Sequence, residues 1–106
     1  MFRRQKTKGL QKVPDIVQKV YGYHIYFWSN EGEPTEPIHF HVSKNPHKNA
    51  TKVWITSSGK LSLANNNDQI PDKVLRRILN FMGLEENIQT TKEKWLYWFE
   101  AIRYIA

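Results

Sequence analysis

The chain has 106 residues, with 16 Lys and Arg, 10 Asp and Glu, four His and no Cys, which gives a formal net charge of +6. This length suits one domain, and the lack of cysteine excludes disulfides, thiolate metal sites and cysteine nucleophiles. The sequence has no run of about 18 apolar residues, so it predicts no transmembrane helix, and we expect a cytoplasmic protein.

The positive charge is concentrated at the N-terminus. Residues 1–12 contain five basic residues and no acid, whereas the rest of the chain contains 11 Lys and Arg against 10 acids. Such a polar segment has too few apolar side chains to offset its ordering entropy, so we expect a flexible leader over residues 1–12 and a single domain over residues 13–106. The leader is also the candidate site for RNA or DNA phosphates. Its basic residues are Arg3, Arg4, Lys6, Lys8 and Lys12.

The sequence predicts four β-strands. Residues 21–29 are rich in aromatic residues and apolar on both faces, which predicts a strand in the middle of a sheet. Residues 30–37 are acidic and contain proline, which predicts a loop. Residues 38–43 and 50–56 alternate as strands do, and Ser57 to Gly59 connects the latter to a short strand at 60–64.

Two helices follow the strands. Pro71 suits the first position of a helix, and Gly83 suits its end. Thr90 and Glu93 have the spacing of a capping box, which predicts that the last helix begins near Thr90. Apolar residues continue at helical spacing to the end of the chain: Trp95, Leu96, Trp98, Phe99, Ile102 and Ile105. The predicted fold is therefore α+β, an antiparallel meander of three to four strands followed by two helices packed on one face.

The clearest candidate site is the pair His39 and His41. On a strand these residues point to the same side, whereas Ile38, Phe40 and Val42 point to the other. Because the second set is the expected core face, we expect the histidine face to be open or semi-open. Two imidazoles at this spacing suit a 2-His-1-carboxylate metal site, an acid–base pair, or a surface without a chemical role.

Several residues are candidates to complete this pair. Glu31, Glu33 or Glu36 in the preceding loop could supply a carboxylate, and a divalent metal such as zinc would then be held by His39, His41, His24 and Glu36. His24 joins the pair only in one strand register, because a slip of one residue moves it to the other face. His47 is a further candidate.

The same residues carry a resemblance to a known family. Tyr21-Gly22, the aromatic strand, the acidic loop and Pro37-Ile38-His39-Phe40-His41-Val42, followed by Gly59-Lys60-Leu61, Ile70-Pro71 and Trp95, resemble the bacterial small-protein family of unknown function DUF4160. The resemblance covers about residues 14–99. It implies an α+β domain, with the two histidines as the functional centre. It also implies one half of a two-gene module of the toxin–antitoxin type, beside a second small protein.

Two classes of function follow. The first is an interaction module that contacts a small protein encoded nearby, and also RNA or DNA through the leader, without contacting a membrane. The alternative is a small nuclease or hydrolase in which His39 and His41 act as acid and base, or a metal-binding domain that uses them. The sequence does not decide whether the protein is an enzyme.

Overall fold

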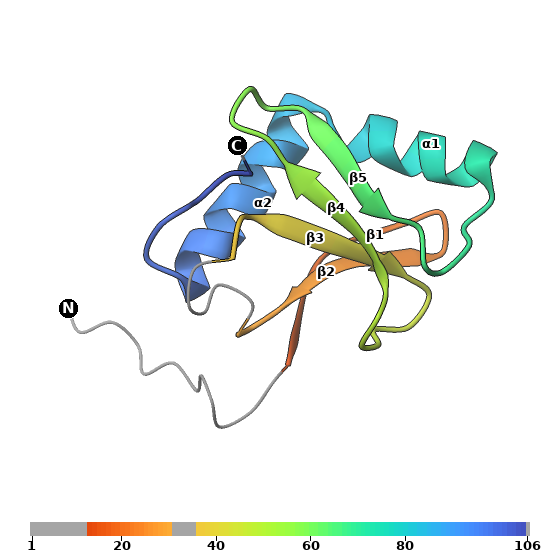
Figure 1. Ribbon diagram of the computed structural model, residues 1–106, viewed down its shortest axis with the longest axis horizontal. Helices are drawn as coiled ribbons and strands as arrows, with labels where there is room; N and C mark the ends of the chain where they lie inside the picture. Colours follow the sequence, from red (N-terminus) through yellow and green to blue (C-terminus); the bar gives the residue numbers. More distant parts are fainter. Residues whose placement is uncertain (1–12, 31–35, 106) are drawn as a thin grey trace.

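The computed structural model describes residues 13–30 and 36–105, so the basic leader lies outside the described residues. The chain forms five strands and then two helices (Figure 1). The elements are β1 (Pro14–Val20), β2 (Tyr23–Trp28), β3 (His39–Ser43), β4 (Thr51–Ile55), β5 (Leu61–Asn65), α1 (Asp72–Met82) and α2 (Glu85–Trp98). Every strand is antiparallel to its sequence neighbour, and the sheet has the order β1-β2-β3-β4-β5. The predicted α+β meander followed by two helices is confirmed.

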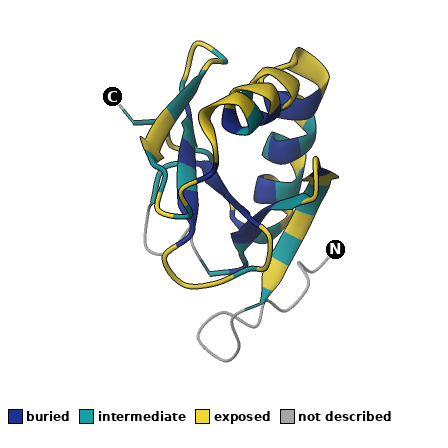
Figure 2. Cartoon of the chain, turned by 90° about the vertical axis from the view of Figure 1, so that its right-hand side faces the viewer, coloured by how far each residue is buried: buried dark blue, intermediate teal, exposed yellow. Residues whose placement is uncertain are grey.

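One face of the sheet is covered by the helices and carries the core. The alternation of β3 places Phe40 and Val42 on this face, fully buried with Val53 of β4. The helices contribute Ile78 and Trp95 to the same cluster. Figure 2 shows the buried residues of the helices facing the sheet and the exposed residues facing outward. The amphipathic pattern of the sequence therefore identifies the core face of the sheet correctly.

The sheet has one strand more than the sequence predicts, because β1 pairs with β2 through a tight hairpin. Val20 pairs with Tyr23, so only Tyr21 and Gly22 lie in the turn. Both have positive φ angles, 52° and 82°. A two-residue turn with positive φ at both positions matches the right-handed twist of the flanking strands. Strand β2 consequently begins after this turn and is paired on both sides, as expected for a strand inside the sheet.

Helix α1 follows the prediction, with Pro71 and Gly83 flanking its ends. The predicted start of α2 is wrong: the helix begins at Glu85, and the Thr90 hydroxyl donates to the Glu86 carbonyl within the helix (3.0 Å) instead of capping it. Acidic residues in the first turn interact favourably with the positive end of the helix dipole, which suits a start at Glu85. No helix in the described ranges is long and apolar enough to cross a membrane.

The predicted end of α2 is also wrong. The helix ends at Trp98, and Phe99 is extended with φ −125° and ψ 152°. Phe99 still packs in the core, 4.6 Å from Trp95 between ring centroids. The segment that follows returns to the sheet, where the Arg103 carbonyl accepts a hydrogen bond from the Ile38 N–H (2.8 Å). Apolar residues at helical spacing are thus used here by an extended segment, because tertiary contacts outweigh helix propensity.

Candidate functional site

His39 and His41 lie next to each other on β3, where they alternate with the core residues Phe40 and Val42. Their ring centroids are 5.1 Å apart, with the rings nearly perpendicular. The expectation of an open or semi-open histidine face is wrong, because both side chains are buried: His39 is 0% exposed and His41 is 7% exposed. The rings of Trp54 and Trp95 lie 5.6 Å and 5.4 Å from that of His39. Aromatic neighbours thus enclose His39.

A local hydrogen bond fixes the ring of His39. Its Nδ1 lies 2.8 Å from the carbonyl oxygen of Pro37. A carbonyl can only accept, so Nδ1 carries the hydrogen in this contact. The bond sets the tautomer and the orientation of the ring. It also gives a polar atom of this buried side chain a partner, as buried polar groups generally have.

The strand register places His24 on the same face as the pair. His24 pairs with Ser43, and Tyr26 pairs with His41. His24 therefore lies one step along the face from the position opposite His41, which Tyr26 occupies. The Nδ1 of His24 donates to the Lys44 carbonyl (2.8 Å), so its ring is oriented toward the loop after β3.

The candidate carboxylate Glu36 forms an ion pair. Its Oε2 lies 2.7 Å from Nζ of Lys52, which also lies 4.3 Å from the centroid of the Trp54 ring. Within residues 13–30 and 36–105, no group of three or more His, Cys, Asp and Glu side chains could hold a metal ion. Glu31 and Glu33 lie outside the described residues, as do the basic residues of the leader.

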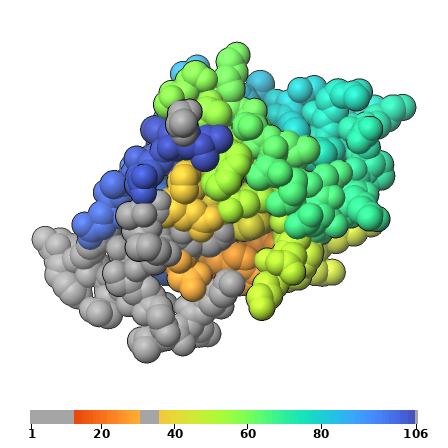
Figure 3. Space-filling model, in the orientation of Figure 1, coloured from red at the N-terminus to blue at the C-terminus, as the bar shows by residue number. Residues whose placement is uncertain are grey.

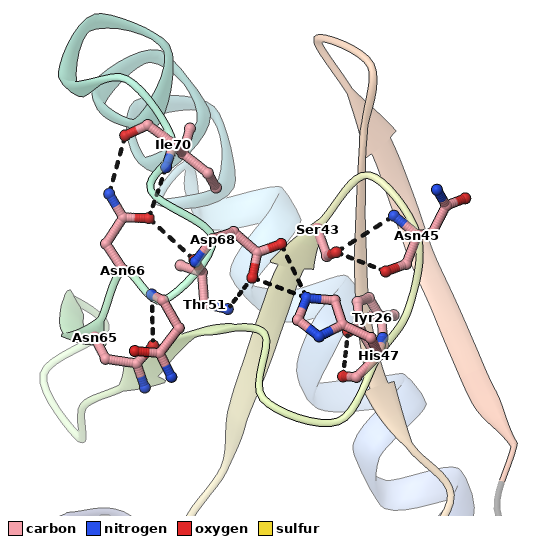
Figure 4. A network of polar contacts seen from close by, with 10 residues as sticks. Tyr26, Ser43, Asn45, His47, Thr51, Asn65, Asn66, Asp68 and Ile70 are labelled. Atoms are coloured by element: carbon pink, nitrogen blue, oxygen red, sulfur yellow. Dashed lines mark hydrogen bonds and ion pairs between the residues drawn. The ribbon is translucent and has the colours of Figure 1, made fainter.

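A second polar site lies at the other end of β3. It is an open pocket of about 360 Å³ lined by Tyr23, Ser43, Lys44, Asn45, His47 and Asp68. The Nε2 of His47 lies 3.0 Å and 3.1 Å from the two carboxylate oxygens of Asp68 (Figure 4). The side chain of His47 is 50% exposed and that of Asp68 only 13%. A half-exposed imidazole is thus held by a mostly buried carboxylate.

Hydrogen bonds also hold the backbone around His47 and Asp68, which together are called the His47–Asp68 dyad. The Tyr26 hydroxyl accepts from the His47 N–H (3.2 Å) and donates to the His47 carbonyl (3.3 Å). The Asp68 carboxylate also accepts from the Thr51 N–H (3.1 Å), and the Thr51 hydroxyl accepts from the Asp68 N–H (3.0 Å). Figure 4 shows that the loop after β3 and the turn after β5 meet here. The dyad is therefore positioned before any ligand arrives.

The sequence did not identify Asp68 or Tyr26 as site residues. Asp68 is 21 residues from His47, and only the pairing of β4 with β5 brings the two together. Tyr26 lies in an aromatic strand, where the sequence shows no partner for its hydroxyl. The one available signal was the polar run Asn65 to Asp68, a composition typical of side chains that hydrogen-bond to nearby backbone.

Comparisons with known proteins place the chain in a family. No curated protein and no solved structure matches it significantly. A family model described as "Domain of unknown function (DUF4160)" matches residues 22–96, from the turn before β2 to the last part of α2. This range includes the His39–His41 pair and the His47–Asp68 dyad. The chain belongs to the DUF4160 family.

Proposed function

We propose that this protein is an interaction module that binds a small protein encoded beside it, as one component of a toxin–antitoxin-like gene pair. The observation that carries the proposal is the difference between the two edges of the sheet. One edge, β1, has features that prevent pairing with another strand. The other edge, β5, lacks most of them.

Strand β1 is a protected edge. It begins with Pro14, which has no N–H to donate, and a bulge interrupts its register between Ile16 and Gln18. Its Asp15 is engaged by α2, since the Trp98 Nε1–H donates to it (2.7 Å) and Lys94 lies 3.4 Å away. Proline, charge, bulges and covering helices are the usual means by which proteins block edge pairing.

Strand β5 has neither a proline nor a charged residue in its sequence, Leu61 to Asn65. It pairs with β4. The register shift in this pairing lies at the C-terminal end of β5, between Leu63 and Asn65. Leu63 on this strand is 43% exposed, so its apolar side chain is available for contact. Figure 3 shows the green atoms of β5 at the molecular surface. An extended segment of a partner could pair with this edge and cover Leu63.

The burial of the histidine pair also supports a function through surface contact. An acid–base pair or a metal site must be reached by its substrate or ion, and His39 is fully buried. The rings of His39 and His41 pack against Trp54, Trp95 and Tyr26, as core side chains do. Function through surface contact requires no opening of this cluster.

The experiment is co-expression with the product of the neighbouring gene, followed by measurement of the dissociation constant. We expect a complex that Leu63→Lys weakens by about tenfold or more, which corresponds to about 1.4 kcal/mol. The matched control is Ile16→Lys, the same change at an exposed apolar residue of β1, which is expected to bind normally. Absence of a complex at micromolar concentration, or equal weakening by both substitutions, would refute the proposal.

A further inference from the structure

The His47–Asp68 dyad has the geometry of a general base. The two carboxylate oxygens of Asp68 both face Nε2 of His47, so the neutral imidazole carries its hydrogen on that nitrogen. The lone pair of the ring is then on Nδ1. Among the described residues, none forms a hydrogen bond with this Nδ1, and half of the side chain is exposed at the pocket. A base oriented by a carboxylate, with its other nitrogen accessible, is the arrangement found in hydrolytic sites.

The described residues that line the pocket include one lysine and no arginine. Lys44 lines it, with Nζ 5.6 Å from the ring centroid of Tyr23. The charge of Lys44 balances that of Asp68, so the pocket has no excess positive charge to attract a dianion. A monoanion loses less to repulsion by Asp68 and keeps the attraction of Lys44. Lysine is a frequent phosphate ligand, and the remaining lining side chains, Ser43 and Asn45, are polar.

We propose that this pocket hydrolyses a phosphodiester, with His47 as general base, Asp68 as its positioning residue and Lys44 as the phosphate ligand. The oxygen of a water molecule forms a bond to phosphorus, and Nδ1 of His47 takes one of its protons. The bond between phosphorus and one ester oxygen breaks, and that oxygen leaves with its electron pair and is protonated by solvent. The imidazolium then returns its proton to solvent, so one diester and one water give a phosphomonoester and an alcohol.

The dyad is rigid enough for this task. The main chain of His47 is held on both sides by the Tyr26 hydroxyl, and the Asp68 carboxylate is fixed by the Thr51 N–H. The Ser43 hydroxyl donates to the Asn45 carbonyl (2.6 Å) and accepts from its N–H, which closes the turn that carries Lys44. A base held in place before the reaction avoids the cost of reorganisation during it.

The test uses the full chain with bis(p-nitrophenyl) phosphate, an RNA oligonucleotide and a DNA oligonucleotide. We expect turnover of at least one of them, and whichever is cleaved identifies the source of the diester as a small molecule, RNA or DNA. His47→Ala should reduce turnover to background. Asp68→Asn, which keeps an acceptor for the Thr51 N–H, should lower kcat about 100-fold with little change in KM. Lys44→Ala should mainly raise KM.

The matched control is Lys48→Ala, which removes an exposed lysine next to His47 outside the pocket lining and should leave kcat and KM unchanged. Backbone amide NMR spectra of each variant, compared with those of the unaltered chain, check that the fold is intact. Lack of turnover of all three substrates by the unaltered chain would overturn the proposal. Equal turnover by His47→Ala, purified identically, would overturn it as well. Neither result bears on partner binding at β5, which is measured separately.

Discussion

Asn66 holds the turn that carries Asp68, and replacing it by alanine tests how much this turn contributes to stability. The Asn66 Oδ1 accepts from the Thr51 hydroxyl and from the Ile70 N–H, both at 3.0 Å, and its Nδ2 donates to the Ile70 carbonyl (2.9 Å). These bonds enclose Gln69, which has a φ of 54°. A residue other than glycine keeps a positive φ only where surrounding contacts impose it.

The expected loss follows from these contacts. Each partly buried hydrogen bond contributes about 1 kcal/mol net, so Asn66→Ala should lower the free energy of unfolding by about 3 kcal/mol. Urea unfolding followed by tryptophan fluorescence measures it. Asn65→Ala is the matched control, since that side chain makes one exposed bond, to the Asn67 N–H (3.0 Å), and should cost less than about 1 kcal/mol.

A double-mutant cycle makes the test sharper. Thr51→Val keeps the shape of a fully buried side chain and removes its hydroxyl, which bonds to both Asn66 and the Asp68 N–H. The two substitutions share one hydrogen bond, so their combined effect should be smaller than the sum by about 0.5–1 kcal/mol. Strict additivity, or equal losses for Asn65→Ala and Asn66→Ala, would show that the network is not what holds the turn.

Three further predictions concern other parts of the chain. Asp15→Ala removes the carboxylate that accepts the indole N–H of α2 and should cost about 1.5–3 kcal/mol in urea unfolding, whereas Lys94→Ala should cost less than about 1 kcal/mol. Titration calorimetry with zinc should show no uptake at micromolar concentration, because His39 and His41 are buried; stoichiometric uptake that His39→Ala abolishes would contradict this. If the chain binds RNA or DNA, deleting residues 1–12 should reduce the slope of log K against log salt by up to about 4.5, and an unchanged slope would remove the leader as a phosphate-binding segment.

The strands that the sequence predicted correctly are those with strong alternation. Phe40 and Val42 of β3 pack in the core as their spacing requires, and β4 and β5 begin and end within a residue of their predicted bounds. Strand β1 has only a weak pattern, and its hairpin uses Tyr21 where asparagine or aspartate would have given a recognisable turn. The spacing of His39 and His41 predicts that the two rings lie close together, as they do, but their burial depends on aromatic rings from β4 and α2, which local pattern does not reveal.

The helix boundaries show a different limit. The spacing of apolar residues continues past Trp98, so periodicity alone predicts a helix to the end of the chain. The structure instead uses Phe99 to fill the core and Arg103 to pair with Ile38. Contacts between residues 65 positions apart are invisible to a window of a dozen residues, and the same is true of the link between His47 and Asp68.

The contact between Asp15 and Trp98 has a consequence for how the chain folds during synthesis. The residues are 83 positions apart, whereas the strands of the sheet pair with their nearest neighbours in sequence. At about 5–20 residues per second, a ribosome needs roughly 4–17 s to make the intervening chain. During this time the β1–β2 hairpin can already be paired, but its aspartate has no indole to bind. Of the five strands, the first to be synthesised therefore waits longest for its contact with α2, and until then its side facing α2 is open to other nascent or folded chains.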